Sequence, residues 1–490
     1  MKKTILTFCL AVMAVLALNA ETYRGPIVVQ YMGMTRTQTV DVTVTQGDNG
    51  LNTLVLEVPI FGTMTMSDVA SSTTDGITVY SAERIVYNEV LQRNLRTVLF
   101  ARTVNGMMAA NVTLPDQGAS MWFNTVDDRY QLPNSDLEAW SNTTTGEPDR
   151  WHGFKTATGT WAWAAPATLA QSEDVHSGST GQYSAVVTSK SVFGTVANGT
   201  MTSGWLNAGS TSATDSTNNY ASSAQSYGDD YFIPLQAKPD QFKVWLKFQP
   251  EATNSRAKVS VKTFDGTYYQ EPYPEGTTYT NLSGGIVGGQ IAVCDWTQFT
   301  FPMNYENYAG NNAETNGIFV TFSTNVNPGQ GSNNDKLFID EMELVYLGAL
   351  TDLRYQGASL QGWDPSTLNY SIQTASVPDL DDFTATVVGA SAVLNKSMEQ
   401  NEDGTYRIAI SVVSADLQNA ACYIITATVA QQFSMGDVNH DKSVDVGDVT
   451  ALIAAILNNG EVDMNVADMN GDHIIDVADV TSLIALILSN

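Results

Sequence analysis

Oxygen-bearing side chains recur in two segments near the end of the chain, in the same pattern each time. The first segment contains Asp437, Asn439, Asp441, Ser443, Asp445 and Asp448, and the second, 31 residues later, contains Asp468, Asn470, Asp472, Ile474, Asp476 and Asp479. These are positions 1, 3, 5, 7, 9 and 12 of a twelve-residue loop, in which position 7 can offer its backbone carbonyl whatever its side chain. Because Ca²⁺ takes roughly six to eight oxygen ligands, each loop is predicted to bind one calcium ion.

An apolar segment with helical periodicity follows each loop. Its apolar side chains are Val449, Leu452, Ile453, Ile456 and Leu457 in the first copy and Val480, Leu483, Ile484, Ile487 and Leu488 in the second. Their spacing places them on one side of an α-helix, so we expect the two helices to bury these stripes against each other. A conventional helix–loop–helix hand would need a helix before the first loop, but the preceding residues are β-branched and then irregular.

This loop-then-helix unit, repeated within residues 434–490, resembles a type I dockerin. Dockerins are calcium-dependent modules that attach extracellular proteins to cohesin domains, so the resemblance implies two calcium ions and a cohesin-like partner. It also implies that loop positions 10 and 11 face that partner, and these are Val446, Gly447, Val477 and Ala478. The alternative is that these residues pack each loop against its helix. Lys442 and His473 depart from the usual pattern, because position 6 of a calcium loop normally holds glycine.

The beginning of the chain has the features of an export signal. Two lysines precede an apolar run that ends in small residues at Ala20, so residues 1–20 are predicted to be a cleaved signal peptide. No other apolar stretch reaches the eighteen or so residues that a transmembrane helix needs. The net charge of −28 excludes a nucleic-acid partner on electrostatic grounds and suits divalent cations. We therefore expect a secreted protein that is extracellular or associated with the cell surface.

Residues 21–118 and 349–430 both consist of short strand-like segments. The first stretch alternates apolar and polar residues, which predicts an antiparallel barrel or sandwich. It resembles the calycin-like domains of secreted Bacteroidetes proteins, whose lipocalin relatives hold small apolar ligands. The second stretch fits an immunoglobulin-like sandwich and resembles the cadherin-like domains that serve as spacers in exported bacterial proteins.

Residues 121–348 lack helical periodicity and place strand-like segments between loops rich in Gly, Asn and Ser, which predicts a two-sheet jelly roll. The motifs N-x-D-x-E-x-W from Asn134 and P-x-x-W from Pro148 resemble the carbohydrate-metabolism domain of Bacteroidetes, whose fold many carbohydrate-binding modules share. In those relatives a calcium ion often joins the first strand to the last. The resemblance would make Glu138 and Asp340 ligands of a further calcium ion, unless both are simply solvated at strand ends.

Aromatic residues in the same stretch are candidates for carbohydrate binding. Trp161 and Trp163 are two residues apart, and on a strand they would share one face, either as a platform for sugar rings or as part of the core. Tyr268 and Tyr269 belong to a tyrosine-rich segment that is predicted to be a loop, where aromatic side chains favour recognition. A glycosidase would need two carboxylates about 5–10 Å apart, and the sequence alone does not pair any.

These features predict a mainly β multidomain protein with a small α-helical calcium-loop module at its C-terminus. Its expected function is calcium-dependent docking to a cohesin-type partner, with carbohydrate binding by the jelly roll, as part of polysaccharide breakdown. One alternative is a glycoside hydrolase with its active site in the jelly-roll loops. Another is a structural protein of the cell surface that acts in adhesion. An acidic pair across a cleft would favour the hydrolase, and the absence of an aromatic-lined groove would favour the structural protein.

Overall fold

The structure is a computed structural model that describes residues 20–47, 49–74, 77–104, 106–125, 130–222, 231–430, 433–458 and 460–489. The predicted signal peptide, except for its last residue Ala20, lies outside the described residues. The chain forms two compact units. One comprises Met1–Leu368, Phe383–Ser397 and Ala409–Tyr423, and the other comprises Asn369–Asp382, Met398–Ile408 and Ile424–Asn490.

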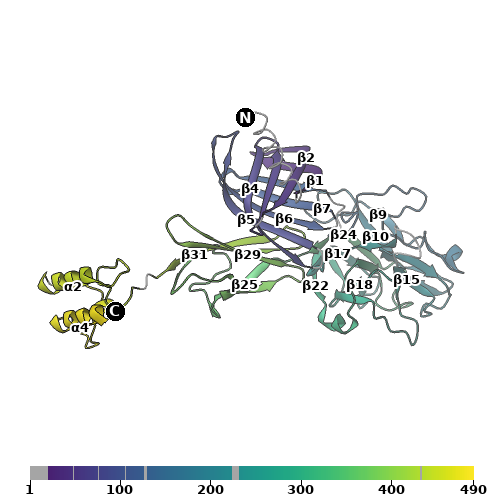
Figure 1. Cartoon of the computed structure of the whole chain (residues 1–490). Helices are drawn as coiled ribbons and strands as arrows, with labels where there is room; N and C mark the ends of the chain where they lie inside the picture. The colour runs from purple at the N-terminus through teal and green to yellow at the C-terminus, as the bar shows by residue number, and fades with distance from the viewer. Residues whose placement is uncertain are drawn as a thin grey trace. The chain divides into compact units, whose positions relative to one another are not determined.

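The first eight strands form a closed barrel in which each strand pairs with the next (Figure 1, purple to blue). They are β1 (Ala20–Tyr31), β2 (Met34–Gln46), β3 (Asn52–Val58), β4 (Gly62–Thr74), β5 (Ile77–Asn88), β6 (Arg93–Val104), β7 (Met107–Leu114) and β8 (Ala119–Asn124). β8 closes the barrel on β1, with Phe123 opposite Ile27. Alternate side chains point inward and form one buried cluster, as period-2 patterning requires. The barrel therefore extends past residue 118, where the sequence placed its end, to Asn124.

The next strands form one large curled sheet that folds over its own core. Their order is β13-β23-β18-β20-β22-β17-β24-β10-β9, with β16 beside β23 and β21 beside β18. The strands are β9 (Leu169–Ser172), β10 (Ser184–Thr188), β13 (Thr200–Thr202), β16 (Ile233–Pro234), β17 (Gln241–Gln249), β18 (Ala257–Phe264), β20 (Leu282–Ile286), β21 (Gln290–Ile291), β22 (Cys294–Asn304), β23 (Gly317–Ser323) and β24 (Lys336–Val345). Inward residues of β17, such as Phe242, share one buried cluster with Phe322 of β23, so the two halves of the sheet face each other.

Two small sheets accompany the curled sheet. One is a hairpin of β11 (Lys190–Val192) and β12 (Thr195–Ala197), and the other has the order β14-β15-β19. Its strands are β14 (Trp205–Ala208), β15 (Asn218–Ser222) and β19 (Tyr269–Glu271).

Seven later strands form two further sheets. The first has the order β26-β25-β28, from β25 (Ala349–Tyr355), β26 (Ala358–Ser359) and β28 (Phe383–Val388). The second has the order β27-β31-β30-β29, from β27 (Asn369–Thr374), β29 (Val393–Gln400), β30 (Tyr406–Val413) and β31 (Ala420–Val429), with β27 parallel to β31.

The C-terminal module consists of α2 (Val446–Asn458), a short α3 (Met464–Ala467) and α4 (Val477–Ser489). α2 and α4 lie side by side (Figure 1, yellow) and bury Leu452 and Leu483. The predicted apolar stripe is only partly buried, because Ile453 and Leu457 of α2 and their counterparts Ile484 and Leu488 of α4 are exposed. No helix within the described residues is long and apolar enough to cross a membrane. The prediction of a mainly β protein with a small C-terminal helical module is confirmed.

Candidate functional site

In the first predicted calcium loop, the first and last carboxylates organise the backbone. Asp437 accepts hydrogen bonds from the backbone N–H groups of Asp441 (Oδ1, 3.0 Å) and Lys442 (Oδ2, 3.0 Å). Asp448, the first acidic residue inside α2, accepts from the N–H groups of Asn439 (Oδ1, 3.0 Å) and Asp445 (Oδ2, 2.9 Å). The two carboxylates therefore hold opposite ends of the loop together.

The second loop repeats this arrangement. Asp468 accepts hydrogen bonds from the N–H groups of Asp472 (Oδ1, 3.2 Å) and His473 (Oδ2, 2.9 Å), the counterparts of Asp441 and Lys442, and also from that of Gly471 (Oδ1, 2.8 Å). Asp479 accepts from the N–H groups of Asn470 (Oδ1, 3.2 Å) and Asp476 (Oδ2, 2.9 Å), and also from that of Met469 (Oδ1, 2.8 Å). The sequence repeat is therefore also a repeat of backbone geometry.

The residues at positions 3 and 5 also interact in the same way in both loops. The amide of Asn439 donates to Asp441 Oδ2 at 2.9 Å, and the amide of Asn470 donates to Asp472 Oδ2 at 3.0 Å. The backbone N–H of Ser443 and the Asn439 amide hold the pKa of Asp441 below its usual value. Both loops therefore keep the oxygen donors of these positions next to each other.

Position 6 is left-handed in both loops although neither residue there is glycine. The backbone φ is 74° at Lys442 and 63° at His473. A left-handed backbone costs a residue with a Cβ atom roughly 1–2 kcal/mol, which is why calcium loops prefer glycine at this position. The two departures noted in the sequence therefore strain the loops without changing their path.

The donor set of the loops fits a hard cation. The carboxylates at positions 1 and 12 are buried in both loops. Among the described residues, the ion pair recorded at a loop carboxylate is that of His473 Nδ1 with Asp468 Oδ2, at 3.5 Å. Buried carboxylates without a fixed counter-charge are costly, so a bound cation would stabilise the loops.

Carboxylates alone do not complete either site. Within the described ranges, no three Asp, Glu, His or Cys side chains come together closely enough to hold a metal by themselves. An ion in these loops would therefore also need amide oxygens of Asn439 or Asn470 and the backbone carbonyl at position 7. Ca²⁺ accepts all of these ligand types.

The residues predicted to face a partner lie on the first turn of each helix. Val446 is 70% exposed and Val477 is 69% exposed, and Gly447 and Ala478 beside them are exposed as well. The alternative that these valines pack each loop against its helix is therefore wrong. Each valine also begins an exposed row at i, i+4, i+7 and i+11, which we call the outer face: Val446, Thr450, Ile453 and Leu457 on α2, and Val477, Thr481, Ile484 and Leu488 on α4.

Trp161 and Trp163 do not lie on a strand, so the shared-face argument from the sequence is wrong. They flank and enter a short 3₁₀ helix (Ala162–Ala164), because the preceding loop is bound to the edge strand β14. The backbone N–H of Trp161 donates to the carbonyl of Ala208 at 2.8 Å. The indole rings are nevertheless adjacent, with centroids 6.0 Å apart and planes inclined at 33°. Trp163 is 76% exposed and therefore does not belong to the core.

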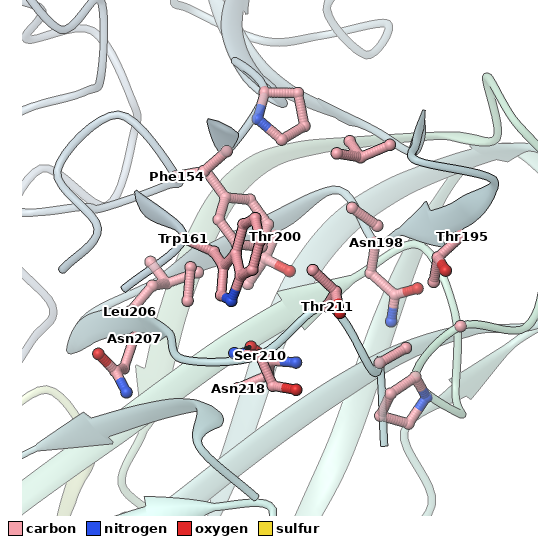
Figure 2. A pocket seen from close by; sticks show the side chains of 18 of the residues that line it. Phe154, Trp161, Thr195, Asn198, Thr200, Leu206, Asn207, Ser210, Thr211 and Asn218 are labelled. Carbon is pink, nitrogen blue, oxygen red and sulfur yellow. Dashed lines mark hydrogen bonds between the residues drawn. The ribbon is translucent and has the colours of Figure 1, made fainter. Parts of the chain in front are cut away.

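Trp161 also lines a pocket beside the β11–β12 hairpin. Figure 2 shows the rings of Phe154 and Trp161 on one side of this pocket and the side chains of Thr195 and Asn198 on the other. β14, β15 and the segment between them supply further lining residues, including Asn207, Ser210, Thr211, Asn218 and Asn219. Half-buried aromatic rings and polar side chains thus line the same pocket.

The two tyrosines predicted to bind carbohydrate differ in their surroundings. Tyr269 is completely buried in a small cluster with Phe264, Leu282 and Phe319, so its prediction as a contact residue is wrong. The reason is that it lies on β19 rather than in a loop, and its hydroxyl donates to Glu271 Oε1 at 2.7 Å. Tyr268 is 38% exposed, and its hydroxyl donates to Gln270 Oε1 at 2.7 Å.

The two acidic residues proposed for a jelly-roll calcium site both lie near the start of β10, Glu138 beside the residues that precede it and Asp340 on the neighbouring strand β24. Glu138 Oε1 accepts from the N–H groups of Gln182 (2.9 Å) and Tyr183 (2.8 Å). Asp340 follows Ile339, which pairs with Ala185 of β10. Asp340 is buried and its Oδ2 has no hydrogen-bond partner. Burial, reinforced by the charge of Glu341, raises its pKa to about 6. Asp340 is thus not simply solvated.

Comparison with known proteins identifies one part of the chain. Residues 435–488 match the dockerin type I domain. Type I dockerin domains bind calcium and dock to cohesins, which agrees with the loop pattern. No curated protein matches the chain.

Two solved structures resemble it weakly. One is described as "a putative glycoside hydrolase from Bacteroides thetaiotaomicron", with 13% identity, 58% of this chain and 86% of that chain covered, and a TM-score of 0.32. The other concerns "carbohydrate-binding modules from the beta-sandwich super family", with 10% identity, coverages of 66% and 97%, and a TM-score of 0.22. Scores this low carry no argument about this chain.

Sequence reasoning missed several residues of these sites. In the dockerin module it assigned Ile453, Leu457, Ile484 and Leu488 to the helix–helix contact, whereas they extend the outer faces. The i, i+4, i+7, i+11 spacing that starts at Val446 would have separated this face from the inner one. At the pocket it missed Phe193, which meets Trp161 edge to face at 6.2 Å. Its signal was a bulky aromatic residue directly before Gly194 in a short hairpin.

Proposed function

We propose that this is an exported, glycan-associated protein whose C-terminal module, residues 434–490, docks to a cohesin-type partner when calcium is bound. The observation that carries the proposal is the double repeat. Two loops with the same carboxylate geometry each lead into a helix with the same exposed apolar row. An apolar surface of this kind, next to an ion site, suits a protein partner.

In this proposal each loop holds one Ca²⁺ ion. The ligands in the first loop are Asp437, Asn439, Asp441, Ser443 through its carbonyl, Asp445 and Asp448. In the second loop they are Asp468, Asn470, Asp472, Ile474 through its carbonyl, Asp476 and Asp479. The ions neutralise carboxylates that would otherwise repel one another, and so fix the start of α2 and α4. Calcium thereby positions Val446 and Val477 for the partner.

The repeat also gives the module an approximate two-fold symmetry. A partner that recognises the outer face of α2 therefore meets nearly the same row on α4, where valine, threonine, isoleucine and leucine recur in the same order. Docking is expected in either of two orientations. The test is binding of the full chain to an immobilised panel of type I cohesins, in calcium and in chelator. Binding that persists in chelator would contradict the proposal.

The same proposal assigns carbohydrate binding to the jelly-roll region, and Trp161 and Trp163 support it. An exposed indole beside a half-buried one offers flat apolar surface, which suits the faces of sugar rings. The hydrolase alternative would require a pair of carboxylates, and the described residues that line the Trp161 pocket include neither Asp nor Glu. The structural-protein alternative expects no aromatic-lined groove, whereas Phe154 and Trp161 line this one.

We also propose a third calcium ion near the start of β10, with Glu138 and Asp340 among its ligands. The buried, unpartnered Oδ2 of Asp340 supports this, because a cation would satisfy it. Such an ion would tie the segment around Glu138 to the last strand of the sheet, β24. Its role would be to stabilise the domain that carries the pocket.

A further inference from the structure

The pocket beside Trp161 has a size that suits one ring. Its volume is about 150 Å³. A protein cavity of roughly this volume holds one six-membered ring such as benzene. The pocket is open to solvent on one side, and Figure 2 shows Trp161 in the wall opposite Thr195 and Asn198. A single residue of a longer chain could therefore enter while the rest remains outside.

Phe193, at the edge of this pocket, is held in an unfavourable position. It lies at the tip of the β11–β12 hairpin with a φ of 49°, a left-handed conformation that is uncommon for bulky residues. Its ring is 70% exposed rather than buried, so burial does not offset the strain. The hairpin instead sets the ring edge-on to Trp161. Strain of this kind is concentrated at binding sites.

An unsatisfied hydrogen-bond acceptor lies in the lining. Asn219 is only 8% exposed, and its amide nitrogen donates to the carbonyl of Ser216 at 2.8 Å. Its Oδ1 atom is buried and has no hydrogen-bond partner. A buried acceptor without a partner is costly, so a ligand that donates a hydrogen bond there would be favoured.

The lining carries no formal charge among its described residues. Its polar groups are amides and hydroxyls of Asn, Ser, Thr and Tyr, and its other residues are aromatic, aliphatic, proline or glycine. Such a surface offers no counter-charge to a uronate, a sulfate or an amine. Aromatic faces together with amide groups match a ring that has apolar C–H faces and hydroxyl edges.

We propose that this pocket binds one unit of a neutral saccharide, which contacts the rings of both Trp161 and Phe193 and donates a hydroxyl hydrogen bond to Asn219 Oδ1. This inference rests on the proposed glycan-associated function and names the site and the class of ligand. The docking module takes no part in it. Trp163 extends the aromatic surface outside the pocket for a neighbouring unit of the chain.

The test is calorimetric titration of the full chain with cellohexaose, xylohexaose and mannohexaose as neutral probes and with hexagalacturonic acid as the charged comparison. We expect at least one neutral probe to bind and the acidic one not to bind. Phe193→Ala removes an exposed ring and should weaken binding about tenfold at an unchanged melting temperature. Asn219→Leu keeps the branched shape of the side chain, removes the acceptor together with the donor to Ser216, and should weaken binding by a similar factor. Tyr87→Ala, at an exposed aromatic of the barrel, is the control and should have no effect.

The other outcomes separate this inference from the function on which it rests. If a neutral probe binds but Phe193→Ala and Asn219→Leu bind it as the unaltered chain does, the glycan-associated function stands and the pocket assignment is wrong. If only hexagalacturonic acid binds, the ligand class is wrong. If no probe binds, both the pocket assignment and the glycan role fall, while the docking proposal is unaffected.

Discussion

Removing the first aspartate of either calcium loop tests the central proposal most directly. Asp437→Ala and Asp468→Ala each delete a carboxylate that is buried and accepts hydrogen bonds from backbone N–H groups three to five residues further along its loop. Each substitution should eliminate one calcium ion and leave the other loop intact. Glu461→Gln is the matched control, because it removes one negative charge from an exposed residue between the loops.

The size of the effect follows from the small core of the module. The buried residues of its core cluster are Val438, Leu452, Ala467, Val480 and Leu483. A core in a domain of this size rarely supplies more than about 3–5 kcal/mol. At calcium a thousandfold above its dissociation constant, each ion adds about 4 kcal/mol. Unpaired N–H groups in the mutated loop add roughly 1–3 kcal/mol to the loss. Each variant should therefore lose about 5–7 kcal/mol in calcium and much less in chelator.

Two measurements on the full chain check this. Calorimetric titration should show a drop from two calcium ions in the dockerin module to one in each variant and no change for Glu461→Gln. Hydrogen exchange should accelerate in α2 and α4 when chelator is added to the unaltered protein. Exchange that is indifferent to chelator, or two ions still bound by Asp437→Ala, would refute the reasoning.

Three further outcomes are expected. Val446→Asp or Val477→Asp alone should weaken cohesin binding little, whereas the double variant should lose roughly 3 kcal/mol or more of binding free energy through buried charge. Surface plasmon resonance measures this binding. Loss of binding in either single variant would show that only one orientation is used. Tyr269→Ala should destabilise its domain by roughly 3–5 kcal/mol in thermal unfolding, whereas the exposed Tyr268→Ala should cost less than about 1 kcal/mol. In chelator, the free energy of unfolding should decline as the pH rises from about 4 to about 6. The pKa of Asp340 is about 6 in the folded state, above its unfolded value, so the buried carboxyl must ionise inside the fold over this range. Asp340→Asn should abolish that decline in a pH series of melting temperatures, and calcium should oppose it if an ion binds there.

The sequence predicted best where one short segment determines its own geometry. Each calcium loop is fixed by side chains within twelve residues, so the spacing from Asp437 to Asp448 was enough to predict a loop that leads into a helix, although α2 begins at Val446, within the loop. Alternation likewise predicted the strands of the barrel, since Ile27 and Val29 must point inward together. The closing strand β8 was assigned to the next domain, because pairing with β1 is a long-range contact that local patterning does not contain.

The carbohydrate site was less predictable because it depends on tertiary contacts. The spacing of Trp161 and Trp163 implied one strand face, but hydrogen bonds to β14 turn this segment into a 3₁₀ helix. Tyr269 looked like a loop residue because prolines surround it, yet pairing of β19 with β15 draws it into the core. Asn219 and Phe193 come to the pocket beside Trp161 from two separate small sheets. Such a contact between distant segments cannot be predicted from the local sequence pattern.

The exposed rows of α2 and α4 are identical in residue type, and burial does not explain this. Inner positions of two packed helices must both be apolar, so Leu452 and Leu483 agree because of their shared core. No such constraint acts on the outer face, where Leu457 is 78% exposed and Leu488 is 81% exposed. All four outer positions nevertheless carry the same residue type in both copies. Exposed leucine and isoleucine add nothing to the module alone and favour aggregation. The identical residues in the two rows are explained if one surface of the partner binds either outer face. The double variant, rather than either single one, should therefore abolish docking.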